Sequence, residues 1–466
     1  MKLHFLGANR QVTGSRYCLE TDRARVMIDC GLFQERPFAG RNWSTCPLPP
    51  ASLDAMLLTH AHIDHSGLIP RLVREGFRQT IHATSPTVAL CDVMLRDSAE
   101  IQMEDAAYKR KRHQREGRRG RYPEEPLYTE EDVDRTMPLF EGVGYGQAID
   151  VAPGISATFF DAGHILGSSM ILVTVEENSR TRTILFSGDV GQWEKPIIRD
   201  PTLFQRADYV VMESTYGDRD HEDAGDVATQ LEHVIRETIE RGGNVVIPTF
   251  AVERAQELMY FISGLIHDGR VPKVKVFLDS PMAVDVTEIF RRYREYFDQE
   301  TWQRINSQQS PLHFPGLHFA STVDQSKAIN HEQAPSIIMA TSGMCTGGRI
   351  KHHLRQNITD PRNTILFVGY QGVGTLGREI LDRPPYVRIH GRDYKVAAEV
   401  RRIYGFSGHA DRSALWRWLT HLEQPPQHVF LTHGEETVAL ALADRIRREL
   451  QWTASVPEYQ SVVDLG

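Results

Sequence analysis

The chain has 466 residues, more than one compact core usually holds, so we expect at least two domains. Hydrophobic residues make up 41% and charged residues 24%, as in ordinary globular proteins, and no apolar run approaches the roughly 18 residues of a membrane span. The net charge of −8 excludes a uniformly basic nucleic-acid-binding protein, so a nucleic-acid partner would have to meet local clusters of Lys and Arg.

Short apolar runs separated by turn residues fill residues 1–207 and predict strands, several of which end in His or Asp. The strands are expected in the segments "MKLHFLGANR", "ARVMIDCG", "DAMLLTH", "ISATFFDAGH", "SSMILVTVEE" and "RTILFSGDVG". Helices are expected in "SGLIPRLVREG" and from residue 84 onward, where Thr84 or Ser85 can cap the helix and Pro86 suits its first turn. This part therefore predicts layered sheets flanked by helices.

The pattern of apolar residues changes over residues 208–394, where strands of the fully buried type alternate with helices. The strands are "ADYVVMEST", "GNVVIPTF", "KVKVFLDSP", "PSIIMATSG" and "NTILFVGYQ". Such alternation predicts a doubly wound parallel sheet, in which ligands bind beyond the carboxyl ends of the strands. The Gly-, Ser- and Thr-rich segments at these ends suit an anion.

Residues 395–466 resume the pattern of residues 1–207. They contain two successive units of strand, His-bearing loop and helix. We therefore expect an α/β protein in which residues 1–207 and 395–466 form one domain and residues 208–394 form a second domain inserted into it. The whole chain contains five cysteines: Cys18, Cys30, Cys46, Cys91 and Cys345. They are scattered and form no CxxC pair, which predicts reduced thiols and a cytoplasmic protein.

The segment "LTHAHIDHSG" places His60, His62, Asp64 and His65 directly after an apolar run. A core would not accept four hydrophilic side chains there, whereas imidazole and carboxylate are the ligands that zinc prefers when no thiolate is offered. A loop this short does not easily bring all four groups to one ion, so the pattern favours two metal ions a few ångströms apart.

Two metals need further ligands, and other predicted strands end in suitable residues. His164 in "DAGHILGS", Asp189 in "SGDVG" and His433 in "LTHGEE" each precede a Gly by a few residues. Taken alone, each would be a turn residue or a helix cap. Together with the first cluster, they are candidate metal ligands.

These motifs resemble those of a known family. "THAHIDHSG", "DAGHILGSS" and "FSGDVG" are similar to the metal-binding motifs of the metallo-β-lactamase fold, and "ESTYGDR", "FSGHAD" and "LTHGEE" to those of its β-CASP nucleases. "GANRQVTGS", "PTFAVERAQEL", "TSGMCTGGR" and "GYQGVGTLGR" also match that branch, in the family's order. The resemblance is closest to the group of the cleavage and polyadenylation specificity factor endonuclease and its prokaryotic relatives. It implies an αββα sandwich with an inserted β-CASP domain.

The resemblance also implies the roles of the site residues. His60, His62 and His164 would bind one Zn²⁺, Asp64, His65 and His433 the other, and Asp189 would bridge them. His409 would be the general acid for the departing 3′ oxygen and Glu213 would orient it, with Asp64 beside them at the catalytic centre. From the residues alone, Glu213 could instead pair with Arg219, and His409 could lie beside a helix cap.

The implied activity is that of a two-zinc ribonuclease. It would cut single-stranded RNA mainly at internal bonds and leave a 5′-phosphate and a 3′-hydroxyl. A 5′–3′ exoribonuclease, a DNA nuclease, a small-molecule hydrolase of the same fold and a catalytically silent scaffold are the alternatives. Homodimers are common among similar proteins. The inserted domain is expected to cover the site, with phosphate contacts from Ser407, Arg254, Arg349 and Arg378, although each Arg could equally be solvated or paired internally.

Residues 109–121, "KRKRHQREGRRGR", contain eight Lys or Arg and one Glu, and an acidic segment follows them. We expect these residues to form a solvated loop that continues from the end of a long helix. The functional alternative is an electrostatic guide for RNA phosphates.

Overall fold

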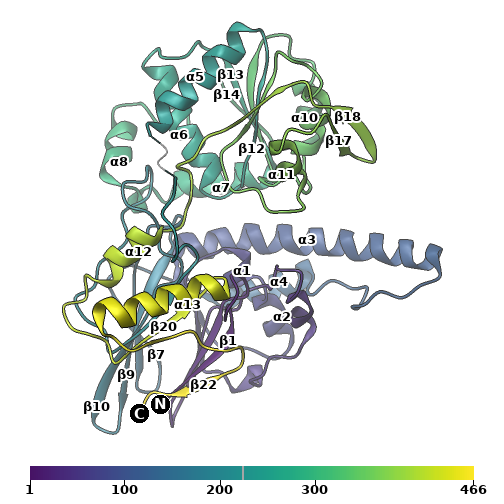
Figure 1. Cartoon of the computed structure of the whole chain (residues 1–466). Helices are drawn as coiled ribbons and strands as arrows, with labels where there is room; N and C mark the ends of the chain where they lie inside the picture. The colour runs from purple at the N-terminus through teal and green to yellow at the C-terminus, as the bar shows by residue number, and fades with distance from the viewer. Residues whose placement is uncertain (223–224) are drawn as a thin grey trace. The chain divides into compact units, whose positions relative to one another are not determined.

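The computed structural model describes residues 1–222 and 225–466 and divides into two compact units. Unit 1 comprises residues 1–193, 200–220 and 409–466, and unit 2 comprises residues 194–199 and 221–408. Figure 1 shows two sheets in the first unit and one large sheet in the second.

Unit 1 contains two seven-stranded sheets. The first has the order β22-β1-β2-β3-β4-β5-β6, with β1 (Lys2–Gly7), β2 (Arg16–Glu20), β3 (Arg25–Ile28), β4 (Ala55–Leu57), β5 (Ile81–Thr84), β6 (Phe140–Val143) and β22 (Val462–Asp464). The second has the order β21-β20-β11-β10-β9-β8-β7, with β7 (Ala148–Ala152), β8 (Ile155–Asp161), β9 (Ser169–Glu177), β10 (Arg180–Phe186), β11 (Tyr209–Glu213), β20 (His428–Thr432) and β21 (Ala454–Ser455). The predicted N-terminal strand is therefore present as β1.

The two sheets pack face to face because alternate residues of each strand point inward. In β8, Ile155, Ala157 and Phe159 are buried in a core that they share with Leu3 and Phe5 of β1, and the residues between them are partly exposed. Each large apolar side chain buried in this way contributes about 1.5–3 kcal/mol. This shared core holds the two halves of unit 1 together.

Helices cover both outer faces of the sandwich. α1 (Ile63–Ser66), α2 (Ile69–Arg74), α3 (Ser85–Glu116) and α4 (Glu130–Thr136) lie on the side of the first sheet, and α12 (Arg412–Leu419) and α13 (Glu436–Arg445) on the side of the second. A second core packs α12 and α13 against β9, β10, β11 and β20. The layers are helix, sheet, sheet, helix, so the predicted αββα sandwich is confirmed.

Two helices differ from the pattern expected at residues 66–76 and beyond residue 84. The segment after the His cluster forms two short helices, α1 and α2, because the chain turns at Leu68 and Pro70 restarts it in the first turn of α2. The next helix begins as predicted, with the Thr84 side chain accepting a hydrogen bond from the Thr87 amide. It continues as α3 to Glu116, well into the basic segment, and ends at Gly117 with φ +63°.

Unit 2 is built on a six-stranded sheet of order β14-β13-β15-β12-β16-β19. All its strand pairs are parallel: β12 (Val245–Pro248), β13 (Lys275–Asp279), β14 (Leu317–Ala320), β15 (Ser336–Ala340), β16 (Thr364–Phe367) and β19 (Glu399–Arg402). A hairpin of β17 (Tyr386–Ile389) and β18 (Arg392–Lys395) is separate from it. The predicted doubly wound parallel sheet is confirmed.

Helices flank this sheet in Figure 1, with α5 and α6 on one face and α10 and α11 on the other. The helices of unit 2 are α5 (Val227–Glu240), α6 (Arg254–His267), α7 (Pro281–Arg292), α8 (Gln299–Asn306), α9 (Val323–Ile329), α10 (Ile350–Asn357) and α11 (Leu376–Leu381). Throughout residues 1–222 and 225–466, no helix is both long and apolar enough to cross a bilayer. All five cysteines are free thiols.

Candidate metal centre

The candidate site lies at one edge of the αββα sandwich, where strands of both sheets end. The HAHIDH segment follows β4, His164 follows β8, Asp189 follows β10, and His433 follows β20. β10, β11 and β20 are parallel, and β8 runs in the same direction, so their carboxyl ends meet at this edge. The Ser169 amide donates to the Thr59 carbonyl oxygen at 2.8 Å and joins the two sheets beside the site.

Two of the site's loops touch through a glycine. The Gly191 amide donates to the Ala162 carbonyl oxygen at 2.8 Å, and a Cβ at Gly191 would lie 1.6 Å from the Gly163 carbonyl oxygen. Only glycine therefore allows the loop of Asp189 to approach the loop of His164 this closely. The last glycine of "SGDVG" thus lets the loops of two candidate ligands meet.

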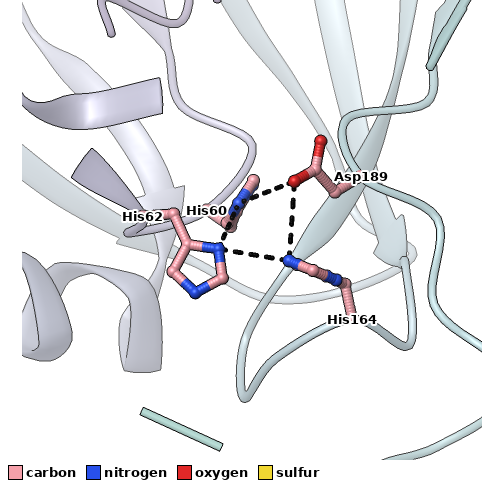
Figure 2. Close-up of side chains that lie close together, drawn as sticks. All are labelled: His60, His62, His164 and Asp189. Atoms are coloured by element: carbon pink, nitrogen blue, oxygen red, sulfur yellow. Dashed lines mark hydrogen bonds and ion pairs between the residues drawn. The ribbon is translucent and has the colours of Figure 1, made fainter. Parts of the chain in front are cut away.

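His60, His62, His164 and Asp189 form the first group, which Figure 2 shows with their side chains directed toward a common centre. His62 Nδ1 lies 3.1 Å from both His60 Nε2 and His164 Nε2. Asp189 Oδ2 lies 3.5 Å from His60 Nε2 and from His164 Nε2. Residues more than a hundred positions apart therefore present their ligand atoms to one small volume.

Asp64, His65 and His433 form a second group beside the first. His65 Nε2 lies 3.1 Å from His433 Nε2, and His433 Nε2 lies 3.4 Å from Asp64 Oδ2. His433 has a φ of +48°, and its ring is steadied by the Thr215 hydroxyl, 3.2 Å from Nδ1. All seven residues proposed as metal ligands are thus brought together.

Asp189 stands between the two groups. Its Oδ2 faces His60 and His164, and its Oδ1 lies 3.2 Å from His65 Nε2 and 3.5 Å from His433 Nε2. Oδ1 is buried and has no hydrogen-bond partner in the described part of the chain. A buried carboxylate oxygen without a hydrogen bond is costly unless a cation satisfies it.

The donor atoms fit metal ions. Tetrahedral ligands that bind zinc at about 2.0–2.1 Å lie roughly 3.3 Å from one another, and the closest donor atoms in the first group are 3.1–3.5 Å apart. One proton can satisfy only one nitrogen–nitrogen contact at a time, whereas a cation satisfies all of them. The set contains only imidazole and carboxylate, which suits zinc without thiolates.

The electrostatics of the site favour bound positive charge. Burial, together with the neighbouring His65, holds the pKa of His60 well below its ordinary value, so His60 is a neutral imidazole able to bind a metal. Burial opposes the charged form of His65 as well, but the carboxylates Asp189 and Asp29 outweigh it and raise the pKa of His65. The carboxylates therefore attract a cation, either a proton or a metal ion.

Asp29 orients His65, a role that the motif pattern did not assign. Its Oδ2 accepts from His65 Nδ1 at 2.7 Å, and its Oδ1 accepts from the Thr59 amide at 2.9 Å. This contact fixes which ring nitrogen of His65 points into the site. The signal in the sequence was the Asp at the end of "VMID", after the strand β3.

Asp29→Asn is expected to weaken metal binding at the second group by about 10–100-fold, because His65 loses the carboxylate that orients its ring and raises its basicity. Competition with a metallochromic chelator would measure the affinity, and excess metal should restore activity.

Asp208→Asn is the matched control. Its carboxylate also accepts from a threonine amide and hydroxyl, those of Thr183, but does not touch the metal groups. Equal metal affinity in the Asp29→Asn and Asp208→Asn variants would contradict the role of Asp29.

His409 and Glu213 lie at the border of the two metal groups. His409 Nδ1 lies 3.2 Å from both carboxylate oxygens of Glu213, and His409 Nε2 lies 3.9 Å from Asp189 Oδ2. Glu213 is buried and accepts from the Val190 amide at 2.6 Å, so it is fixed to the Asp189 loop. Arg219 pairs with Asp218 and lies over the Tyr216 ring, so the structure does not show the alternative pair of Glu213 with Arg219.

Burial works against the charged form of His409, but Glu213 and Asp189 outweigh it and raise its pKa to about 9. His409 is therefore an imidazolium at neutral pH. It is 24% exposed, unlike the fully buried His60, so its ring can meet a molecule from solvent.

The four residues expected to contact phosphates belong to unit 2, and each Arg has protein partners. Arg254 donates to the Val368 carbonyl oxygen at 2.5 Å, and Arg349 binds Asp279 at 2.6 Å and the Ala320 carbonyl oxygen at 2.8 Å. Arg378 pairs on the surface with Asp382 at 3.0 Å. Ser407 is partly exposed, two residues before His409. Arg254 and Arg349 are thus paired internally, as the alternative interpretation allowed.

The fold and the site define a class of protein. Residues 18–200 match the family model of a metallo-β-lactamase superfamily domain, residues 255–380 that of a Beta-Casp domain, and residues 393–457 that of a Zn-dependent metallo-hydrolase RNA specificity domain. The chain belongs to the β-CASP family of metallo-β-lactamase-fold proteins, which confirms the resemblance seen in its motifs.

Similar proteins occur in bacteria and archaea. The chain is 39% identical over 442 residues to Ribonuclease TTHA0252 of Thermus thermophilus, covering 95% of both proteins. It is 32% identical to Transcription termination factor FttA of Methanosarcina mazei, covering 96% of this chain and 69% of that protein, and 33% identical to FttA of Methanocaldococcus jannaschii, covering 98% and 70%. A crystal structure of a protein of unknown function from Enterococcus faecalis V583 has a TM-score of 0.56 at 12% identity over 99% of both chains, and shares the fold.

Proposed function

We propose that this protein is a two-zinc ribonuclease that hydrolyses single-stranded RNA mainly at internal phosphodiester bonds, leaving a 5′-phosphate and a 3′-hydroxyl. The position of the Asp189 carboxylate supports this proposal most strongly. The carboxylate lies between two groups of ligand atoms, and its Oδ1 is buried without a hydrogen bond in the described chain. His60, His62 and His164 would hold one ion, Asp64, His65 and His433 the other, and Asp189 both.

Zinc ions bound there would act as Lewis acids that activate water and offset negative charge on a phosphoryl group. The chain itself supplies the proton for the leaving group. His409 Nδ1 donates to Glu213, which leaves the Nε2 proton of the imidazolium directed toward the metal groups. That proton can pass to the departing 3′ oxygen. Asp64, whose Oδ2 lies 3.4 Å from His433 Nε2, would also line the catalytic centre.

RNA as the substrate is supported by the RNA specificity domain matched at residues 393–457 and by the ribonuclease named among the relatives. A direct comparison of RNA and DNA of one sequence tests this choice of substrate. The free thiols support our proposal of a cytoplasmic location. A homodimer stays a prediction.

The test uses zinc-loaded protein with single-stranded RNA and DNA of one sequence, with and without a chelator. We expect RNA with a blocked 5′ end to be cut into internal fragments with 5′-phosphates, cleavage to stop with chelator, and added zinc to restore it. Cleavage only from a free 5′ end would indicate an exonuclease, and cleavage of DNA alone a DNA nuclease. Activity that survives chelation would contradict the metal-dependent mechanism.

Glu213→Gln is expected to move the basic limb of the pH–rate profile to lower pH by about 1–3 units. The carboxylate of Glu213 is one of the charges that raise the pKa of His409, and bound cations would offset the contribution of Asp189 but leave that of Glu213. A general acid is active below its pKa, and its activity is lost as the pH rises through that value. Lowering the pKa of His409 therefore removes activity at a lower pH.

The measurement is kcat against pH for RNA cleavage, with metal content determined on the same samples. A basic limb that stays in place in the Glu213→Gln variant, at unchanged metal content, would show that His409 is not the acid whose ionisation limits the rate.

A further inference from the structure

The outer half of α3 and the turn after it, residues 101–121, form a feature that we call the basic arm. In Figure 1, α3 extends far beyond α1, α2 and α4 of the same unit. Its 32 residues correspond to about 48 Å of helix. Eight Lys or Arg lie within residues 109–121 of a chain whose net charge is −8, so the arm concentrates positive charge in an acidic protein.

One narrow stripe of the arm is buried. Past residue 98, the buried residues of α3 are Ala99, Ala106 and His113, each seven positions after the last. They face the chain that returns along the helix, where Glu124 Oε1 lies 2.6 Å from His113 Nδ1 and the Leu127 amide donates to Gln102 at 3.0 Å. The returning chain thus holds the arm as a helix and leaves most of its circumference in water.

The opposite side of the helix carries an exposed stripe. Ile101, Tyr108 and Arg115 are each two positions after a buried residue, which is about 200° around the helix axis. Ile101 is 54% exposed and Tyr108 is 64% exposed. The Tyr108 ring thus lies in water among cations, with Arg112 5.9 Å from its centroid and Lys111 and Arg115 further along the helix.

Several cations of the arm have no carboxylate to neutralise them. Lys109 pairs with Asp105, and Arg112 and Arg118 pair with Glu116. Elsewhere in the arm, Arg110 forms no ion pair but donates to the Glu124 carbonyl oxygen at 2.9 Å. Four further exposed side chains form neither an ion pair nor a side-chain hydrogen bond with any described residue: Lys111, Arg115, Arg119 and Arg121. Their charge is available to an anionic partner.

The helix that forms the arm begins at the metal centre. At the start of α3, the hydroxyls of Thr84 and Thr87 donate to the Gly167 carbonyl oxygen, at 2.6 and 2.9 Å, in the loop that carries His164. The helix therefore runs without a break from that loop to Arg115, about 45 Å away along its axis. A polyanion held by the arm would therefore be bound to the same helix that contacts the loop of His164.

We propose that the basic arm is an auxiliary binding site for single-stranded RNA, distinct from the metal centre. The four unpaired cations contact phosphates, and Tyr108 stacks on a base, as exposed aromatic rings do in proteins that bind single strands. This inference rests on the proposed RNA substrate. It predicts that the arm matters only for RNA long enough to reach both the arm and the metal centre.

The test is a variant in which Lys111, Arg115, Arg119 and Arg121 are all replaced by Gln. Affinity for labelled single-stranded oligouridine is measured over a range of salt concentrations, with chelator present so that the RNA stays intact. The slope of log affinity against log salt should fall by about 2–3, since each phosphate contact contributes about 0.7. For long RNA, KM should rise about tenfold or more at low salt, whereas hydrolysis of a dinucleotide should not change.

The matched control also removes four positive charges, but from surface ion pairs: Arg135 with Glu131, Arg236 with Glu232, Arg304 with Glu300 and Arg362 with Asp360. It should bind RNA as the unmodified protein does. An unchanged slope in the arm variant, or an equal loss in the control, overturns the proposal, and the first result would leave an acidic protein as the partner of the arm. If the unmodified protein cleaves no RNA, the proposed function fails, and the salt slope still decides on the arm.

Discussion

Replacing His409 by alanine is expected to leave the metal content unchanged and to lower kcat for RNA cleavage by about 10²–10⁴-fold. His409 lies 3.9 Å from Asp189 and is held by Glu213, so it borders the ligand groups without being needed to close either one. Its loss removes the proton donor for the leaving oxygen. An RNA analogue with a sulfur leaving group, which needs no proton, should recover most of the lost rate.

The control for this variant is His428→Ala, which removes another partly buried imidazole of unit 1. His428 stacks on Phe430 and lies 2.7 Å from the Ser455 hydroxyl, away from the ligand groups. It should cost stability but little turnover per folded molecule. Full activity of His409→Ala with normal metal content would rule out the acid role, and loss of metal would make His409 a ligand instead.

Asp189→Ala is expected to abolish both metal sites and with them all measurable turnover. Its two carboxylate oxygens face different histidine groups, so one substitution removes a ligand from each ion. The loss of metal affinity should exceed the roughly 100-fold upper bound expected for an orienting residue such as Asp29.

Single-histidine variants make this test sharper. His164→Ala removes a ligand of the first group only, and His433→Ala a ligand of the second only. We expect each to retain the metal of the other group, measured by metal analysis after equilibrium dialysis, with folding checked by thermal unfolding. If Asp189→Ala keeps one metal, as the histidine variants do, Asp189 is not a bridge.

The sequence predicts the layers of this fold because apolar residues recur with different periods in strands and in helices, and both periods can be recognised in the apolar runs. It does not predict the length of α3, because beyond Ala99 only Ala106 and His113 are buried and no apolar pattern marks the helix. The apolar run of β11 resembles the strands of unit 2, but β11 pairs with β10 and β20 in unit 1. The neighbours of a strand depend on the tertiary structure, so a local pattern of apolar residues does not predict them.

The candidate site could be predicted largely because its ligands follow strands, and three of them, His164, Asp189 and His433, are next to glycines. The cluster from His60 to His65 is dense enough to indicate a metal by itself, and it gives meaning to His164, Asp189 and His433. The role of Asp29 could not be predicted, since its partner His65 is 36 positions away and a strand-end Asp is common in turns. The internal pairing of Arg349 with Asp279 likewise depends on contacts across the sheet of unit 2.

The central claim is that seven side chains from distant parts of unit 1 bind two metal ions across Asp189. The most direct measurement is the number of zinc ions bound per chain, followed by titration of the metal-free protein with zinc while RNA cleavage is recorded. We predict two ions per chain, with cleavage appearing as the second site fills. Saturation at one ion or none, or full cleavage by metal-free protein, would contradict the account.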